Sequence, residues 1–289
     1  MENAVMLVKP MYSCQGVPVV VFGKRCPKPC LYCDLSRREF PKDKIIASGR
    51  RAVLEKLVGF KSAYFSAVSD CFLPENRSLA HYLIENVWKN NGNFVPLVVT
   101  KHAIPQKTIV LFAKNRHRIV VQISIPSLND RIVSILEPGA PKVSKRLKII
   151  RKLTDAGVPV IAVVMPWFGI YEKSESIEDL PRELAKAGVS RCIIGTGVLP
   201  EKQMQKMIGT GDKSIVDAAK KMTAIRKAMT KTGYTLPPEK RIREFSRLVS
   251  AFKKFGIKGR ICTADNPDLK GSDLPLCTKF RHHNFRKAE

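Results

Sequence analysis

Short runs rich in valine and isoleucine alternate with amphipathic stretches along most of the chain, and this alternation restricts the fold more than any other feature. Strands are expected at 17–22, 62–68, 95–100, 118–125, 158–165 and 190–194. Helices are expected at 44–58, 77–90, 106–115, 144–156, 177–187 and 213–231. Strands that alternate with helices form βαβ units, and near-continuous apolar strands are typical of parallel sheets covered on both faces. The sequence therefore predicts an α/β fold with six βα units.

The length of 289 residues fits one large α/β domain with an extension better than two equal domains. Apolar residues make up 44% of the chain, which is enough for a sizeable core. We divide the chain into an irregular N-terminal segment (1–16), a core (17–232) and a basic C-terminal extension (233–289). The extension begins with a helix expected at 239–255 and then becomes rich in Gly, Pro, Asp and basic residues.

Three cysteines follow the first expected strand directly. Cys26, Cys30 and Cys33 are separated by three and then two residues, so their sulfurs can approach one metal centre from a single loop. Thiolates are soft ligands that favour iron–sulfur clusters, zinc or copper(I). A [4Fe–4S] cluster usually takes four cysteines, so three close cysteines without an adjacent fourth predict a cluster with one open iron. A zinc site or a set of free thiols is the alternative.

This Cx3CxxC stretch, with Tyr32 just before its last cysteine, resembles the radical S-adenosylmethionine (SAM) enzymes. The resemblance implies a six-unit (βα)6 partial TIM barrel and a [4Fe–4S] cluster on the three cysteines. It also implies that SAM chelates the fourth iron and is cleaved reductively to methionine and a 5′-deoxyadenosyl radical. An electron donor such as ferredoxin or flavodoxin would then be a partner.

Polar residues at the ends of later strands resemble the spore photoproduct lyase branch of that family. Ser69 and Asp70 close the second expected strand, Lys101 follows the third, and Ser124 lies at the end of the fourth. The resemblance implies that these four residues orient SAM, while Tyr32 lies against its adenine end. The alternatives are a Ser/Asp cap on the next helix and an ordinary surface lysine.

A second resemblance to this branch lies in the stretch from Glu137 to Arg146, which has the form EP-x-x-P followed by RL. These two residues either bind cofactor or substrate, or form a structural ion pair. The branch places a hydrogen-donating cysteine where this chain has Ala67, which argues against thymine-dimer repair. Cys71 is a candidate for a replacement hydrogen donor, and a buried apolar cysteine is the alternative.

The charge predicts a polyanionic partner. Lys and Arg number 51 and Asp and Glu number 25, which gives a formal net charge of +26. Phosphate contacts release counterions and dominate affinity for nucleic acids, so we expect a nucleic acid substrate, with RNA ahead of DNA. Trp167 and the basic, aromatic-containing tail at 279–287 are further candidates for nucleic acid contact. A basic surface unrelated to the substrate is the alternative.

We expect no membrane span, because no run of eighteen apolar residues is present, and no secretory signal, and therefore a cytoplasmic protein. The remaining cysteines are Cys14, Cys192, Cys262 and Cys277. They are expected to be buried apolar residues, and the alternative is that some of them hold a second metal.

The sequence thus predicts a radical SAM enzyme of lyase or transferase type that acts on a nucleic acid, in RNA modification or a DNA-repair-like reaction. Two alternatives stay open. One is a radical SAM enzyme that acts on a protein or small molecule, and the other is a zinc-containing nucleic-acid-binding protein without catalysis.

Overall fold

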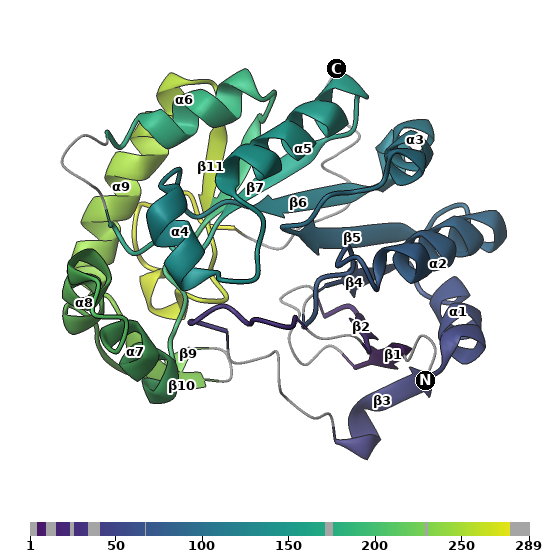
Figure 1. The fold of residues 1–289 in the computed structure, drawn as a ribbon, viewed down its shortest axis with the longest axis horizontal. Helices are drawn as coiled ribbons and strands as arrows, with labels where there is room; N and C mark the ends of the chain where they lie inside the picture. Colours follow the sequence, from purple (N-terminus) through teal and green to yellow (C-terminus); the bar gives the residue numbers. More distant parts are fainter. Residues whose placement is uncertain are drawn as a thin grey trace.

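The computed structural model describes residues 5–9, 16–23, 26–33, 41–66, 68–170, 176–228 and 231–277. Its main feature is a nine-stranded sheet with the order β11-β8-β7-β6-β5-β4-β2-β1-β3 (Figure 1). Six consecutive strands of this sheet are parallel: β2 (Val19–Phe22), β4 (Ser62–Phe65), β5 (Val95–Thr100), β6 (Val120–Ser124), β7 (Val160–Val164) and β8 (Arg191–Ile194). The predicted α/β fold with a six-unit partial barrel is confirmed.

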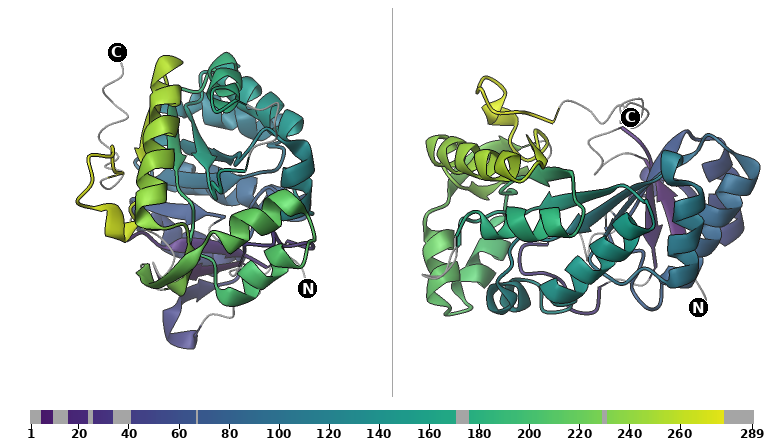
Figure 2. Two further views of the ribbon diagram at one scale, coloured as in Figure 1. Left: turned by 90° about the vertical axis from the view of Figure 1, so that its left-hand side faces the viewer. Right: turned by 90° about the horizontal axis from the view of Figure 1, so that it is seen from above.

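The helices form an outer arc around the curved sheet (Figures 1 and 2). The helices between successive parallel strands are α1 (Arg50–Val58), α2 (Arg77–Asn90), α3 (Gln106–Lys114), α4 (Asp130–Leu136), α5 (Val143–Asp155) and α6 (Asp179–Lys186). The helices cover the outer face of the sheet and the inner face is the interior of the barrel, and all four residues of β2 are fully buried. This burial explains why the strands are continuous apolar runs rather than alternating ones.

The N-terminal edge of the sheet differs from the prediction of an irregular segment over 1–16. Strand β1 (Val5–Val8) pairs antiparallel with both β2 and β3 (Ile45–Ser48). The predicted helix at 44–58 accordingly begins only at Arg50, after a short 3₁₀ turn at Lys42–Lys44 and β3. These four-residue strands carry little periodic signal by themselves, and pairing with a neighbouring strand decides their conformation.

The region after β8 also departs from the prediction. The expected helix at 213–231 ends at Lys220 in α8 (Lys213–Lys220), and a hairpin of β9 (Thr223–Ala228) and β10 (Lys231–Thr235) follows. The residues after α8 include several threonines and a tyrosine, which favour strands. Helices α4 and α7 (Glu201–Ile208) were not predicted.

The C-terminal extension continues the barrel. Helix α9 (Pro238–Lys254) leads to β11 (Lys258–Ile261), which pairs parallel with β8 and so adds a seventh parallel strand. The buried Arg241 on α9 donates hydrogen bonds to the Leu236 carbonyl (2.7 Å) and to the Asn266 side chain (2.9 Å). Two short 3₁₀ helices, at Arg116–Arg118 and Pro267–Leu269, complete the described elements.

Among the described helices, none combines the length and the apolar character that a bilayer crossing requires.

Candidate active site

A cavity of about 240 Å³ lies at the carboxyl ends of the parallel strands. All three motif cysteines line this cavity, together with Tyr32 and polar residues at or just after the ends of β4, β5 and β6. The full lining consists of Cys26, Lys28, Cys30, Tyr32, Cys33, Ser66, Val68, Ser69, Asp70, Val99, Thr100, Lys101, His102, Ser124, Gly139, Ala140, Val163 and Met165. In parallel barrels the carboxyl ends of the strands are where catalytic residues gather, and the position of this cavity agrees.

The cysteine loop contacts the end of α4 and the segment that follows this helix. The Cys33 N–H donates to the Cys30 carbonyl (3.0 Å), which forms a tight turn, and the Leu31 N–H donates to the Leu136 carbonyl (2.8 Å) at the end of α4. Gly139 approaches so closely that an added Cβ would lie 2.5 Å from the Lys28 carbonyl oxygen. The loop therefore depends on a residue without a side chain at position 139.

The three thiols share the cavity but do not converge to ligand distances. Within the described ranges, no three His, Cys, Asp or Glu side chains are close enough together to hold a metal ion. Burial raises the pKa of Cys26 and Cys30, so both are neutral thiols in this state. Metal binding requires thiolates, and it would draw the sulfurs together as they lose their protons.

The donor set fits an iron–sulfur cluster. Three thiols line the cavity, and the described lining residues include no fourth cysteine. Such a set leaves one metal position open for another ligand. A zinc ion with the same three ligands is also compatible with this chemistry.

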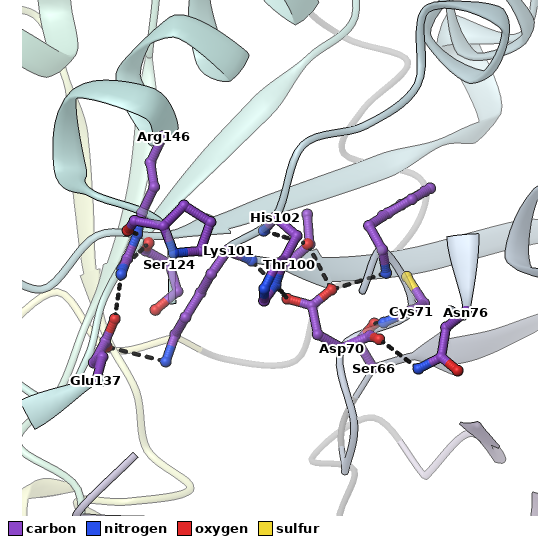
Figure 3. A network of polar contacts seen from close by, with 12 residues as sticks. Ser66, Asp70, Cys71, Asn76, Thr100, Lys101, His102, Ser124, Glu137 and Arg146 are labelled. Atoms are coloured by element: carbon purple, nitrogen blue, oxygen red, sulfur yellow. Dashed lines mark hydrogen bonds and ion pairs between the residues drawn. The ribbon is translucent and has the colours of Figure 1, made fainter. Parts of the chain in front are cut away.

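A buried carboxylate, Glu137, organises one side of the cavity (Figure 3). Its Oε1 lies 3.0 Å from the Lys101 ammonium and accepts a hydrogen bond from the Tyr32 hydroxyl. Its Oε2 lies 2.5 Å from the Arg146 guanidinium, and both side chains of this pair are fully buried. Arg146 also donates to the carbonyls of Ser124 (3.1 Å) and Pro141 (2.9 Å), which ties the end of β6 to the start of α5.

These contacts fix the charge states of the group. Burial alone would raise the pKa of Glu137, but the charges of Lys101 and Arg146 outweigh it, so the pKa is lowered. Burial alone would lower the pKa of Lys101, but the Glu137 carboxylate raises it above its ordinary value. Burial and the same carboxylate raise the pKa of Tyr32 well above its usual range. At neutral pH the group therefore contains one anion, two cations and a neutral phenol.

A second buried carboxylate, Asp70, lies on the other side of Lys101 (Figure 3). Its Oδ1 accepts from the Phe72 N–H (2.9 Å) and the Thr100 hydroxyl (2.7 Å). Its Oδ2 accepts from the Lys101 N–H (2.8 Å) and from His102 Nδ1 (2.9 Å). Burial would raise the pKa of Asp70, but His102 and the other hydrogen bonds together lower it.

The structure therefore divides the predicted SAM contacts into two groups. Ser69, Lys101 and Ser124 line the cavity and can meet a ligand directly. Asp70 also lines it, but protein donors already occupy both of its oxygens, which favours a role in holding the ends of β4 and β5. Glu137 and Arg146 form the ion pair that the sequence left as one of two alternatives, and neither lines the cavity.

Sequence reasoning did not single out His102 or Thr100. Both line the cavity and both hold Asp70, and the only signal for them was their position at the end of β5, next to Lys101. Their contacts depend on how β4 and β5 are arranged in space, which the sequence alone does not display.

The other candidates lie away from the cavity lining. Cys71 is fully buried in the main core, where burial raises its pKa well above the ordinary value. Trp167 is only 4% exposed and belongs to the same core, so it does not offer an open stacking surface. Cys192 is buried and Cys262 and Cys277 are half-buried, and no described group that includes them meets the needs of a metal site. Cys14, Ala67 and the tail at 279–287 fall outside the described residues.

Comparison with solved structures finds similar folds that cover about four fifths of this chain. The chain superimposes on spore photoproduct lyase complexed with dinucleoside spore photoproduct, with a TM-score of 0.57 and 17% identity over 82% of this chain and 74% of that one. A mutant of the lyase with bound AdoMet and the dinucleoside gives a TM-score of 0.58, with 18% identity over 80% of this chain and 72% of the other. The chain has the radical SAM fold. At this level of identity the likeness concerns the fold alone.

In two other comparisons a smaller share of the similar protein is covered. SuiB of Streptococcus suis bound to S-adenosylmethionine, also a radical SAM enzyme, gives a TM-score of 0.52 and 14% identity over 86% of this chain and 51% of that one. The uncharacterized protein ORF301 of Acidianus two-tailed virus is 29% identical over 135 residues, which is 45% of this chain and 44% of the viral protein. The chain thus matches less than half of this curated relative. No protein-family model matches the sequence.

Proposed function

We propose that the protein is a radical SAM enzyme in which Cys26, Cys30 and Cys33 hold a [4Fe–4S] cluster. The observation that carries the proposal is that all three thiols, Lys101 and Ser124 line one cavity at the strand ends of a barrel with this fold. When bound, the cluster supplies the electron that cleaves SAM to methionine and a 5′-deoxyadenosyl radical. The chain itself has to bind SAM, orient it and keep water away from the radical.

Lys101 is the expected partner of the SAM carboxylate. All three donors of its ammonium are in use, since it lies 3.2 Å from Cys30 Sγ, 2.8 Å from the Tyr32 hydroxyl and 3.0 Å from Glu137. Cys30 would turn toward the metal on binding, and this would release one donor for the SAM carboxylate. Glu137 keeps Lys101 protonated and in place throughout.

The amino end of SAM needs an acceptor. The Ser69 hydroxyl donates to the Phe22 carbonyl (3.1 Å), and its oxygen retains lone pairs that can accept from the SAM ammonium group. Asp70 holds the adjacent strand ends in place through the four hydrogen bonds that it accepts, and its oxygens are therefore already occupied. Ser124 completes the polar side of the site, and the ring of Tyr32 with Val68, Val99, Val163 and Met165 forms its apolar side.

We propose a nucleic acid as the substrate, with RNA ahead of DNA. The net charge of +26 supports a polyanionic substrate. Similar structures include spore photoproduct lyase with a bound dinucleoside photoproduct, which supports the same substrate class. Ala67 stands where that branch has its hydrogen-donating cysteine, and this difference argues for a reaction other than photoproduct repair.

Anaerobic reconstitution with iron and sulfide tests the cofactor. We expect brown protein with about four irons per chain, and 5′-deoxyadenosine when SAM and a reductant are added. Replacing all three cysteines with alanine should abolish both. Colourless protein that contains zinc instead of iron would overturn the enzyme proposal and favour a zinc-containing binding protein.

Lys101→Met tests the SAM site separately from the cluster. We expect the iron content to stay the same while SAM affinity, measured by calorimetry, falls at least about tenfold, as for the loss of one charged hydrogen bond. Lys89→Met, at an exposed lysine on α2, is the matched control and should change neither value. Unchanged SAM affinity in the Lys101 variant would contradict the assigned role.

A further inference from the structure

A second cavity, of about 350 Å³, lies between α8, α9 and the segment that follows β7. Helices α8 and α9 lie on the side toward which β5 and β6 point, so this cavity is on the same side of the barrel as the cysteine-lined one (Figure 1). Its lining includes two apolar side chains, Phe168 and Leu236, and the charged residues Asp217, Lys221, Lys240, Glu244 and Arg247. The proposed chemistry uses none of these residues.

The two cavities share an aromatic wall. Tyr32 lines the first cavity and Phe168 lines the second, and their rings meet edge to face with centroids 6.4 Å apart. Both rings belong to one apolar cluster with Leu236, which also lines the second cavity. A ligand that bridges this wall would occupy both sites at once, which is possible for a chain molecule but not for a small one.

The charges in the second cavity favour an anion. Its two carboxylates already have cationic partners: Asp217 lies 3.3 Å from Lys213, and Glu244 lies 3.5 Å from Arg247. Among the described residues, no carboxylate forms an ion pair with Lys221 or Lys240. Burial lowers the pKa of Lys240, the charge of Lys221 lowers it further, and these effects together outweigh the nearby Glu244 carboxylate, which acts in the opposite direction. An anion placed between these two ammonium groups would relieve their repulsion.

We propose that Lys221 and Lys240, in the lining of the second cavity, bind a backbone phosphate of the nucleic acid substrate. The reacting nucleotide would then lie across the wall, in the cysteine-lined cavity. This inference rests on the proposed function, since it names the surface that holds the rest of the substrate. Lysine contacts to phosphate carry affinity and position the strand without reading its sequence.

The test uses the reconstituted holoenzyme and a fluorescently labelled single-stranded RNA of about twelve nucleotides. Affinity is measured between 50 and 200 mM salt for the wild type and for the double variant Lys221→Ala/Lys240→Ala. Two lost phosphate contacts should reduce the slope of log affinity against log salt by about 1.4, and should weaken binding at 50 mM salt at least about tenfold. The matched control is Lys148→Ala/Lys152→Ala, which removes two exposed lysines on α5 and should keep the wild-type slope.

Two results of the direct binding measurements would overturn the inference. One is an equal loss of affinity in both double variants, which would mean that only net charge matters. The other is an unchanged salt slope in the Lys221/Lys240 variant. Competition against the labelled RNA is a further check. If inorganic phosphate or a mononucleotide displaces the labelled RNA as well as unlabelled RNA does at the same phosphate concentration, the inference is also overturned, because the cavity would then serve a small ligand.

The outcome is separable from the proposed function. SAM cleavage in the absence of RNA depends on the first cavity alone, so both double variants should produce 5′-deoxyadenosine at the wild-type rate. If the wild type binds RNA through Lys221 and Lys240 but never cleaves SAM, the second site stands and the proposed enzyme fails. If SAM is cleaved but RNA binding ignores these lysines, the enzyme stands and this site fails.

Discussion

Two buried carboxylates lie on opposite sides of Lys101, and they are stabilised in different ways. Asp70 is held by a backbone N–H on each oxygen, a hydroxyl and an imidazole. Glu137 is held by two full cations and a phenol. Lys101 joins the two, because its backbone N–H donates to Asp70 and its ammonium contacts Glu137 (Figure 3).

The difference predicts how much stability the protein loses when a partner or the carboxylate itself is removed. The support of Asp70 is spread over four hydrogen bonds from residues close to it in the sheet, so the loss of one leaves three. The support of Glu137 is concentrated in charge, and its removal leaves two buried cations facing each other. Breaking a buried ion pair by removing one partner typically costs more than losing a neutral hydrogen bond.

Glu137→Gln should have the largest effect. It leaves Lys101 and Arg146 without their shared anion, and we expect the free energy of unfolding to fall by about 3–5 kcal/mol. Denaturant unfolding of the metal-free protein measures the change. Glu183→Gln is the control, because Glu183 forms an exposed pair with Lys186 (2.7 Å) and should cost about 1 kcal/mol or less. A loss below about 1 kcal/mol at Glu137 would show that charge does not dominate this side of the cavity.

Asp70→Asn should have an intermediate effect. The amide keeps the shape of the carboxylate but turns an NH₂ group toward donors, so we expect a loss of about 1–3 kcal/mol in the same assay. Asp155→Asn, at the exposed end of α5, should stay within about 0.5 kcal/mol of the wild type. If Asp70→Asn lowers the free energy of unfolding as much as Glu137→Gln does, the proposed difference between four hydrogen bonds at Asp70 and two charged partners at Glu137 is wrong.

The pH dependence of stability sharpens the result at Asp70. Its pKa is lowered in the folded state, so its contribution is fully present above the unfolded pKa of about 3.9 and is lost as the pH falls through the folded value. The asparagine variant lacks this titration. We therefore expect the stability difference between wild type and Asp70→Asn to shrink as the pH is taken below about 4. A difference that grows on acidification would mean that burial, rather than hydrogen bonding, controls this carboxyl group.

The sequence predicted the parts of the fold that have long, regular apolar patterns. The helix at 77–90 and the strand at 95–100 have the predicted bounds, because each is long enough to show its period and is followed by a clear change in pattern. Strands β1, β3 and β11 were not predicted. Strands β2, β4 and β8 are equally short, but they lie in the βα alternation that the sequence displays, whereas β1, β3 and β11 depend on pairing with neighbouring strands. Strand β9 was predicted as helix, because the apolar spacing of α8 was extended too far, and β10 was not predicted as a strand.

The candidate site followed a similar rule. Residues at strand ends, such as Lys101 and Ser124, were found because position in a βα unit indicates the cavity. Partners were found only in part. For Glu137 and Arg146 the sequence left a structural ion pair and a ligand-binding role open, and the folded chain shows the guanidinium buried against the carboxylate. His102 was missed because its contact with Asp70 requires two strands to be placed side by side.

His102→Phe should have the smallest effect of this series. Phenylalanine keeps the volume of the ring and removes the Nδ1 donor, which must carry the proton because an ionised Asp70 can only accept. Three donors remain on Asp70, so we expect a loss of about 0.5–1.5 kcal/mol, together with a raised pKa for Asp70 that moves the acid loss of stability to higher pH. Unfolding curves from pH 3 to 7 measure both changes. A loss as large as that of Asp70→Asn, with no shift along the pH axis, would mean that His102 acts through packing rather than through the carboxylate.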